Sequence, residues 1–296
     1  MNSLLHFLDG YNVLFDEPLC GHTSFKIGGP ADALALPESR DELIRLLGVL
    51  KNEKFPYMIM GNGSNLLFSD SGYRGVVIKI GPNMAKMNIS NSSIYTEAGA
   101  FLSTMSAEAM KAHLTGLEFA SGIPGTVGGA VCMNAGAYGS EIKDVFESAE
   151  VLTDDGSIKT YNLNEMKFGY RTSRLISENT ILLSATFNLK ASEYETIKAK
   201  TDELTASRRA KQPLNLPSAG SSFKRPPGHF AGKLIMDSGL RGYTIGGAQV
   251  SEKHCGFIVN KGGASCEDVL KLIEHIQNKV NNDFNVMLIP EIRIIR

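Results

Sequence analysis

The amino-acid sequence predicts an α+β protein, with strands and helices mixed along the chain. Two observations favour this class: segments of alternating apolar residues typical of strands, and stripes of leucine and isoleucine at helical spacing. The length of 296 residues exceeds that of one typical domain. We therefore expect two or three domains, with the functional residues lying between them.

The chain begins with a predicted β-α-β unit. Residues 31–36 alternate as a strand, and Ser39-Arg-Asp-Glu42 has the pattern of a capping box at the start of a helix. The expected buried face of this helix carries Leu43, Leu46, Leu47 and Leu50. A strand over 57–60 then leads into the turn Gly61-Asn-Gly-Ser-Asn65. The turn is thus expected at the carboxyl end of a strand, a common place for ligand contacts.

The middle of the chain combines further strands with one helix. Asp154-Asp-Gly156 lies between two alternating segments and predicts a hairpin. The expected strands cover 76–80, 93–97, 150–153, 157–161 and 180–189, and the expected helix covers 103–113.

The C-terminal region follows a long helix predicted over 194–211. Two prolines in the segment 212–220 end this helix and indicate a domain boundary near residue 212. Beyond it we expect a strand over 256–260, a helix opened by the capping box Ser265-Cys-Glu-Asp268, and a terminal strand over 286–295. The expected inward face of that helix holds Leu270, Ile273, Ile276 and Val280. The predicted division of the chain is 1–80, 81–211 and 212–296.

Composition argues against several classes of function. The chain carries 30 basic and 31 acidic residues without a long run of either sign, so we expect no binding to nucleic acids or membrane surfaces. Residues 1–12 lack a secretory pattern and no apolar run could span a bilayer, so a cytoplasmic protein is expected. No metal site or disulfide framework is indicated by the spacing of Cys20, Cys132, Cys255, Cys266, His6, His22, His113, His229, His254 and His275. We expect the cysteines to be buried thiols.

A second glycine-rich segment is Ser121-Gly-Ile-Pro-Gly-Thr-Val-Gly-Gly-Ala130. Glycines let backbone N–H groups converge on a phosphate without intervening side chains. Neither this segment nor the first turn matches the dinucleotide fingerprint or the P-loop. The two segments therefore predict one site for a nucleotide cofactor on another scaffold.

Three polar residues lie in local sequences that suit catalysis, although each also has a plain structural interpretation. Arg171 is expected in a short loop, where its planar fork could hold a carboxylate or simply face solvent. Ser221 follows a glycine on a constrained turn, and without a nucleophile elbow it suits proton donation better than nucleophilic attack. Glu291 interrupts an apolar strand after a proline, where it is either functional or exposed.

Six motifs occur in one order along the chain. They are Thr23-Ser-Phe-Lys-Ile-Gly-Gly-Pro-Ala-Asp32, Gly61-Asn-Gly-Ser-Asn-Leu-Leu67, Gly122-Ile-Pro-Gly-Thr-Val-Gly-Gly129 with Asn134-Ala-Gly-Ala-Tyr-Gly139, Gly169-Tyr-Arg-Thr-Ser173, Ala219-Gly-Ser-Ser-Phe-Lys224 and Pro290-Glu-Ile-Arg293. Together they closely resemble the UDP-N-acetylenolpyruvoylglucosamine reductase (MurB) family of bacterial peptidoglycan synthesis. The resemblance covers residues 23–295, and six motifs in register are far more specific than any one of them.

This resemblance implies a two-part FAD-binding unit of the vanillyl-alcohol-oxidase (PCMH) type and a C-terminal α+β substrate domain, whose last strand could return to the FAD-binding unit. FAD would be bound between them, NADPH would donate the hydride, and the protein would act as a monomer. The implied FAD-binding residues are Gly61, Asn62, Gly63, Ser64, Asn65, Ser121, Gly122, Ile123, Pro124, Gly125, Thr126, Gly129, Ala130 and Arg208. The implied substrate-binding residues are Tyr170, Lys211, Lys224 and Arg225.

The implied reaction reduces the enolpyruvyl group of UDP-N-acetylglucosamine enolpyruvate to a lactyl ether, giving UDP-N-acetylmuramate. NADPH gives a hydride to FAD, and the reduced flavin gives one to the terminal vinyl carbon. Arg171 would stabilise the charge that grows on the substrate carboxylate, with Glu291 helping to hold the enol form. Ser221 would deliver the proton to the adjacent carbon, while Lys224 or Arg225 stabilises the alkoxide.

The sequence departs from the longer form of that family in two places. Little room exists between Arg174 and Arg208 for the extra tyrosine-bearing loop, so the chain resembles the short form. Arg225 stands where the longer form commonly has asparagine. Two alternatives remain: another FAD oxidoreductase of the same fold, which would lack the serine and glutamate motifs, and a non-catalytic protein that binds flavin or a nucleotide sugar.

Overall fold

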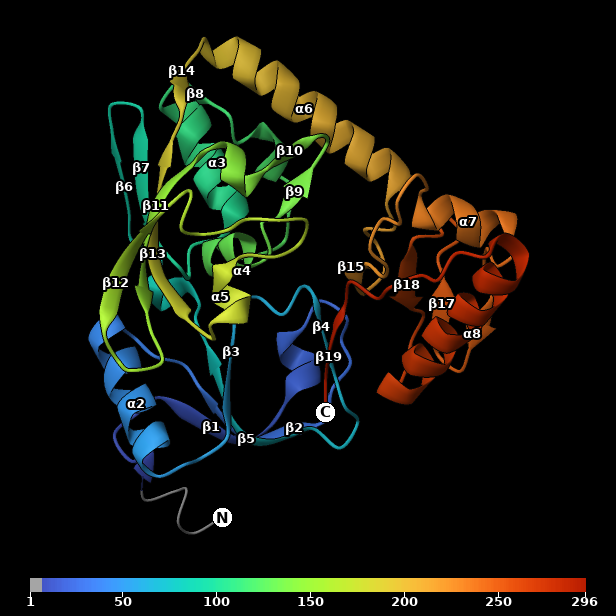
Figure 1. Cartoon of the computed structure of the whole chain (residues 1–296), viewed down its shortest axis with the longest axis horizontal. Helices are drawn as coiled ribbons and strands as arrows, with labels where there is room; N and C mark the ends of the chain where they lie inside the picture. The colour runs from blue at the N-terminus through green and yellow to red at the C-terminus, as the bar shows by residue number, and fades with distance from the viewer. Residues whose placement is uncertain (1–6) are drawn as a thin grey trace. The chain divides into compact units, whose positions relative to one another are not determined.

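The computed structural model describes residues 7–296, which separate into two compact units; Figure 1 shows the chain with its element labels. The first unit contains the described residues up to Leu14, with Ala33–Asn62 and Gly75–Arg208. The second unit contains Phe15–Asp32, Gly63–Arg74 and Arg209–Arg296. Each unit is therefore assembled from segments that are distant in the sequence. His6 and the first residues of the predicted subdomain 1–80 lie outside the described residues, and the predicted division into three stays a prediction.

The long predicted helices are confirmed. The helix expected over 194–211 has those bounds, the one expected over 103–113 covers 102–111, and the two helices expected after capping boxes begin directly after Ser39 and Ser265. Three short helices, α4, α5 and α7, were not predicted. The α-helices are α2 (Arg40–Asn52), α3 (Leu102–Lys111), α4 (Val127–Cys132), α5 (Arg174–Ser177), α6 (Tyr194–Lys211), α7 (Ala231–Asp237) and α8 (Cys266–Phe284).

Within residues 7–296, the strands form three larger sheets and three strand pairs. One sheet has the order β1 (Val13–Pro18), β2 (Pro30–Ala35), β5 (Tyr73–Lys79) and β3 (Tyr57–Met60). A second has the order β12 (Ile158–Asn162), β11 (Phe146–Leu152), β13 (Ile181–Asn188), β7 (Ser93–Glu97) and β6 (Met87–Ser90). A third has the order β15 (Ser218–Ser221), β18 (Phe257–Asn260), β17 (Ala248–Val250) and β16 (Thr244–Ile245). The pairs are β10 (Ser140–Glu141) with β9 (Gly136–Ala137), β14 (Lys190–Ala191) with β8 (Leu114–Thr115), and β19 (Arg293–Ile295) with β4 (Leu66–Phe68).

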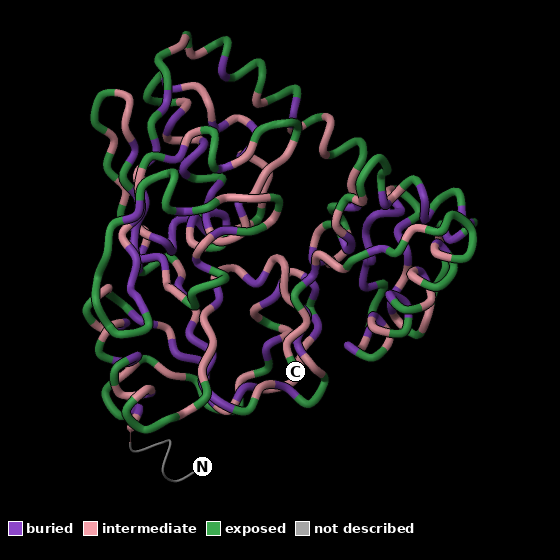
Figure 2. Tube along the Cα trace, viewed as in Figure 1, coloured by how far each residue is buried: buried purple, intermediate pink, exposed green. Residues whose placement is uncertain are grey.

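The first unit has a hydrophobic core of its own, visible as the buried stretches of its strands and helices in Figure 2. The four leucines predicted on the inner face of α2 are all buried, and burial of such a side chain contributes about 1.5–3 kcal/mol. The predicted hairpin is also confirmed, since β11 and β12 pair antiparallel around Asp154-Asp155-Gly156. Arg40 of α2 donates to Glu150 of β11 over 2.8 Å, which fixes the helix against the hairpin.

The second unit is built around α8 and a separate core. The predicted capping box of α8 is confirmed: Ser265 Oγ accepts from the Asp268 N–H, and Asp268 Oδ2 accepts from the Ser265 N–H, both at 3.0 Å. Asp70 closes the same helix end, because its two carboxylate oxygens accept from the N–H groups of Cys266 at 2.7 Å and Glu267 at 3.1 Å. The segment Gly63–Arg74 is thereby fastened to the C-terminal residues of this unit.

Two predictions about helix faces and caps are wrong in detail. Ile273, Ile276 and Val280 of α8 are buried as predicted, whereas Leu270 is only partly buried. Val269 and Leu272 complete the inner face of this helix. In α2, Glu42 accepts from the N–H of Glu38 rather than from that of Ser39, so only the Ser39 half of the expected capping box forms.

The terminal strand is also shorter than predicted. Only Arg293–Ile295 forms β19, rather than the whole of 286–295. The residues before it pair with another segment instead: Lys224 donates its N–H to Ile289 O at 2.8 Å, and Glu291 donates its N–H to Ser222 O at 2.9 Å. Pro290 has no N–H to donate to a ladder and lies at this change of partner.

Among the four cysteines, Cys255 and Cys266 are buried, while Cys20 and Cys132 are only half-buried. The prediction of buried thiols is therefore confirmed for two of them. Burial raises the pKa of the Cys266 thiol to about 11. Within residues 7–296, no helix combines the length and the apolar character needed to cross a membrane.

Candidate active site

The first glycine-rich turn follows β3 and presents backbone N–H groups. Gly63 adopts φ +63°, a left-handed conformation that side chains disfavour. The N–H groups of Gly63, Ser64 and Asn65 donate to no acceptor within the described residues. Consecutive N–H groups of this kind form a concavity that suits an anion. The turn can therefore hold a phosphate, as its sequence predicts.

The second glycine-rich segment lies against Gly61 and Asn62, the two residues of this turn that belong to the first unit. A Cβ on Gly61 would come within 2.2 Å of Thr126 Oγ1, so glycine is required there for the two segments to approach. Asn62 strengthens the contact, because its side-chain amide donates to the carbonyl oxygen of Pro124 over 2.8 Å. Within the first unit, the structure thus brings Gly61 and Asn62 into contact with the second segment.

The second segment uses most of its own N–H groups internally. Val127 and Gly128 donate to the carbonyl oxygens of Ala100 and Ala98, each over 2.8 Å, and Gly129 donates to Thr126 Oγ1 over 3.4 Å. These residues form the first turn of α4. The N–H groups at the start of this helix are consequently already hydrogen-bonded to acceptors of the protein. Fewer donors remain here for a ligand than the glycine content suggested.

Arg208, near the end of α6, contributes a cation to the second segment. A Cβ on Gly122 would lie 2.7 Å from Arg208 Cδ, so the arginine stem passes directly over this glycine. Its guanidinium has no ion-pair or hydrogen-bond partner among residues 7–296. Burial lowers the pKa of Arg208 from its ordinary value, although the group stays charged near neutral pH. A partly desolvated cation beside a glycine loop fits the phosphates of a cofactor such as FAD.

Arg171, a predicted catalytic residue, occupies a strained turn in the first unit. Its backbone adopts φ +54°, which costs a non-glycine residue roughly 1 kcal/mol or more. One guanidinium nitrogen, Nη2, donates to the carbonyl oxygen of Gly136 over 3.0 Å, and the group lies 5.0 Å from the ring centre of Tyr170. The Tyr170 side chain itself is exposed. The arginine is therefore held in place rather than left loose on the surface.

A residue that the site prediction missed supports this turn. Asn134 is fully buried, and its amide donates to Gly169 O at 3.1 Å while its side-chain oxygen accepts from the Lys143 N–H at 3.0 Å. The turn that carries Arg171 is closed between Gly169 and Thr172. The signal was available in the sequence, since Asn134 opens the motif Asn-Ala-Gly-Ala-Tyr-Gly.

Ser221, the predicted proton donor, stands at the end of β15 in the second unit. Gly220 precedes it with φ +79°, and the pairing of β15 with β18 shifts register between Ser218 and Ser221. The Ser221 side chain is exposed and meets no hydrogen-bond partner within residues 7–296. Its fully buried neighbour Ser222 accepts from the Ile258 N–H through Oγ at 2.8 Å. The turn thus presents one serine outward and anchors the next.

Glu291 lies in the same unit as Ser221 and is connected to it through the backbone. Its N–H donates to Ser222 O over 2.9 Å, and its carbonyl oxygen accepts from the side-chain amide of Asn65 over 3.2 Å. The side chain is half-buried. Two of the three predicted catalytic residues are therefore carried by hydrogen-bonded segments of a single unit.

The predicted substrate-binding cations of the second unit differ in their surroundings. The guanidinium of Arg225 lies 4.0 Å from the ring centre of Phe230, a cation–π arrangement that restrains it. Lys224 is half-buried and Lys211 is exposed. All three remain candidates for contacts with an anionic substrate.

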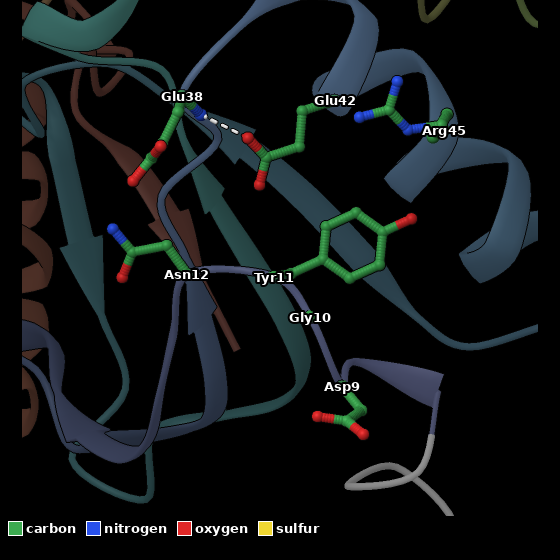
Figure 3. A pocket seen from close by; sticks show the side chains of 7 residues that line it. All are labelled: Asp9, Gly10, Tyr11, Asn12, Glu38, Glu42 and Arg45. Atoms are coloured by element: carbon green, nitrogen blue, oxygen red, sulfur yellow. Dashed lines mark hydrogen bonds between the residues drawn. The ribbon is translucent and has the colours of Figure 1, made fainter.

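Two hollows lie away from the predicted residues. One, in the first unit, measures about 440 Å³ and is shown in Figure 3 with its lining side chains, Asp9, Gly10, Tyr11, Asn12, Glu38, Glu42 and Arg45. The other, in the second unit, measures about 580 Å³ and is lined by Arg209, Pro213, Leu214, Asn215, Leu216, Gln249, Ser251, Glu252, Lys253 and Lys261. None of the predicted site residues lines either hollow.

The glycine segments and Arg208 have the chemistry that suits a phosphate-bearing cofactor, and comparison with known families identifies the class of protein. Residues 31–162 match an FAD-binding domain, and residues 212–295 match the C-terminal domain of UDP-N-acetylenolpyruvoylglucosamine reductase. The chain is thus a flavoprotein with an added C-terminal domain, which confirms the predicted fold class.

Whole-chain relatives identify the family. The chain is 54% identical to the UDP-N-acetylenolpyruvoylglucosamine reductase of Caldanaerobacter subterraneus, and the match covers 100% of this chain and 97% of that protein. It is 51% identical to the enzyme of the same name from Clostridium botulinum strain Hall, with 99% of this chain and 97% of that protein covered. The crystal structure of the Thermus caldophilus enzyme superimposes with a TM-score of 0.83 at 35% identity, covering 97% of this chain and 99% of that one. The chain belongs to the UDP-N-acetylenolpyruvoylglucosamine reductase family, and its 296 residues fit the short form.

Proposed function

We infer that the protein reduces the enolpyruvyl group of UDP-N-acetylglucosamine enolpyruvate to the lactyl ether of UDP-N-acetylmuramate, a step of peptidoglycan synthesis, with NADPH as the hydride source. Full-length identity above 50% to enzymes of this name supports the reaction. The observation that carries the residue assignment is the hydrogen bond from Glu291 to Ser222, because it joins the segments of two proposed catalytic residues.

The FAD-binding residues that we propose are those of the two glycine segments together with Arg208. The N–H groups of Gly63, Ser64 and Asn65 are available to an anion, and Arg208 supplies a positive charge beside Gly122. When bound, FAD would supply hydride transfer from NADPH to the substrate, a redox chemistry that the side chains proposed for this site do not provide. The protein's own residues supply binding, orientation and charge.

Arg171 is proposed to stabilise negative charge on the substrate. Hydride addition at the terminal vinyl carbon pushes electron density toward the substrate carboxylate, where a fixed cation lowers the barrier. The hydrogen bond to Gly136 and the contact with Tyr170 keep the guanidinium from reorganising during the reaction. Glu291 is proposed to help hold the enol form of the reacting group.

Ser221 is proposed to give its hydroxyl proton to the carbon next to the carboxylate. The hydride and this proton together complete the reduction of the double bond, and solvent must later return a proton to the serine. Its exposed hydroxyl and the fixed turn at Gly220 support this role. A serine hydroxyl is a weak acid, so the proposal also requires a nearby cation, for which Lys224 is the candidate.

The remaining assignments concern binding and context. Lys211, Lys224 and Arg225 are proposed to contact the diphosphate and sugar, with Tyr170 beside the reacting end. Because the short form lacks the tyrosine-bearing loop, closure over the substrate must use other residues. We further propose a monomer with the predicted division into three, acting in the cytoplasm, where NADPH and nucleotide sugars are available.

Anaerobic stopped-flow absorbance of the flavin band tests the proposal. Adding NADPH to the purified protein should bleach the band, and adding the enolpyruvyl substrate should restore it rapidly. In Ser221→Ala, bleaching should proceed normally while recovery slows by roughly 10²- to 10⁴-fold, since proton transfer is lost. Arg171→Ala should likewise slow recovery more than bleaching.

Ser218→Ala is the matched control, because Ser218 lies on the same strand and has no proposed catalytic role. It should behave as the wild type does in both steps. Equal slowing of bleaching and recovery in Ser221→Ala would reject the proton-donor role, and a flavin that bleaches without recovering in the wild type would point to a different substrate.

A further inference from the structure

The turn Gly61–Asn65 contains two asparagines whose side chains have different partners. Asn62 donates to Pro124 O within the first unit, over 2.8 Å. Asn65 donates to Glu291 O within the second unit, over 3.2 Å. The resemblance to the family implied that both residues bind the cofactor, but the side chain of Asn65 also donates to the segment that carries a proposed catalytic carboxylate.

The register of β4 and β19 explains the Asn65 contact. In this parallel pair, Arg293 donates its N–H to Asn65 O at 3.0 Å, and Ser69 donates its N–H to Ile295 O at 2.8 Å. Continuing this alternation toward the turn, the next bond would join the backbone N–H of Asn65 to Glu291 O. The Asn65 side chain makes that bond instead. The ladder is thus extended by one bond while the backbone N–H of Asn65 is left for a ligand.

The backbone of Glu291 is consequently held by a hydrogen bond on each side of its Cα atom. Its N–H is bound to Ser222 O, next to the proposed proton donor, and its carbonyl oxygen is bound to Asn65. With the backbone held at both ends, the direction in which the Glu291 side chain leaves the chain is set. Removing one of the two bonds would let this segment shift, since β19 begins only at Arg293.

We propose that Asn65 is a positioning residue for Glu291, acting through its side-chain amide, in addition to offering its backbone N–H to the cofactor. The inference rests on the catalytic role proposed for Glu291. It predicts that the side chain of Asn65 matters chiefly for the step in which the substrate is reduced. The side chain of Asn62, by contrast, should matter chiefly for cofactor binding.

The test uses Asn65→Ala and Asn65→Asp, with Asn62→Ala as the matched control, each saturated with FAD. In Asn65→Ala, recovery of the flavin band on adding substrate should slow by about ten- to a hundredfold, as expected for a displaced catalytic group, while bleaching by NADPH changes less than about threefold. Asn65→Asp should be slower still, since it places a carboxylate against a carbonyl oxygen. Titration of the apoprotein should show near-normal FAD affinity for Asn65→Ala and weaker affinity for Asn62→Ala.

Glu291→Gln separates failure of this inference from failure of the proposed function. If Glu291→Gln recovers at the wild-type rate, the role of Glu291 is wrong and the inference falls with it. If Glu291→Gln is slow but Asn65→Ala is not, only the positioning role is wrong. The double variant should be no slower than Glu291→Gln alone, because Asn65 acts through Glu291. Additive losses, or equal slowing of both steps in Asn65→Ala, would overturn the inference.

Discussion

The turn Gly61–Asn65 and the segment Ser121–Ala130 are both rich in glycine, but their backbone N–H groups have different fates. In the turn, three consecutive N–H groups meet no acceptor within residues 7–296. In the segment, those at the start of α4 are bound to Ala100, Ala98 and Thr126. Glycine content therefore marks an anion site only where donors stay unused; elsewhere it permits close packing.

The largest effect is expected where the two regions touch. Gly61→Ala would place a methyl group 2.2 Å from Thr126 Oγ1, and overpacking of this kind costs about 1–3 kcal/mol. The turn would have to move away from the second segment, so FAD affinity should fall by roughly one to two orders of magnitude. Fluorescence titration of the apoprotein with FAD measures this.

A second substitution checks that explanation. Thr126→Ala removes the hydroxyl that the new methyl group would meet, so Gly61→Ala combined with Thr126→Ala should bind FAD better than Gly61→Ala alone. If the double variant binds no better, the contact between Gly61 and Thr126 does not explain the loss of FAD affinity.

The next effect concerns the cation beside the second segment. Arg208→Met keeps the length of the side chain but removes the charge, and FAD affinity should fall about tenfold, because a hydrogen bond to a charged group contributes about 1.5–3 kcal/mol. The melting temperature of the apoprotein should stay the same or rise, since burial already disfavours this cation and lowers its pKa. Arg209→Met, at an exposed neighbouring position, should change neither quantity.

A smaller effect is expected for a glycine that serves packing alone. A methyl group at Gly128 would lie 3.2 Å from both the Cβ and the carbonyl oxygen of Ala98. Gly128→Ala should therefore lower the free energy of unfolding by about 1 kcal/mol without changing FAD affinity, as its N–H is already bound. Gly48 in α2 has open space around it, and Gly48→Ala should instead raise that free energy by about 0.5–1 kcal/mol. Loss of FAD affinity in Gly128→Ala would contradict the packing role.

The smallest effect is expected at α8, another helix whose first N–H groups are hydrogen-bonded to acceptors of the protein. Hydrogen bonds from the Ser265 and Gly247 N–H groups lower the pKa of Asp268. A lowered folded-state pKa contributes stability that is present above the ordinary carboxyl pKa of about 4 and is lost as the pH falls through the folded value. Asp268→Asn should thus melt below the wild type at pH 7, with the gap narrowing below about pH 4. A gap independent of pH would show that the carboxylate charge is not involved.

Local patterns predicted much of the fold. The end of α6 follows from the prolines after Lys211, the start of α8 follows from Ser265 and Asp268, and the β11–β12 hairpin follows from the turn at Gly156. Each of these depends on residues that are close in sequence. The helix α4 was missed because glycines at its start lower helix propensity, although tertiary bonds to Ala98 and Ala100 stabilise it.

The sequence nominated residues for the candidate site but did not indicate the hydrogen bonds that connect them. Motif spacing indicated Ser221 and Glu291, yet it gave no sign that Ser222 joins them or that Asn65 reaches Glu291. These bonds link residues far apart along the chain, and no local pattern encodes such pairing. The shortened terminal strand has the same origin, since Ile289 and Glu291 pair with residues 222–224 instead.

The pairing of β4 with β19 has a consequence for biosynthesis. β4 leaves the ribosome long before β19, so its hydrogen-bonding edge toward β19 must wait while the intervening residues are made. Contacts of such high sequence separation form slowly, and an unpaired strand edge can associate with other chains meanwhile. We therefore expect the nascent protein to acquire its cofactor late, and chaperones that shield this edge to raise the yield of flavin-loaded enzyme.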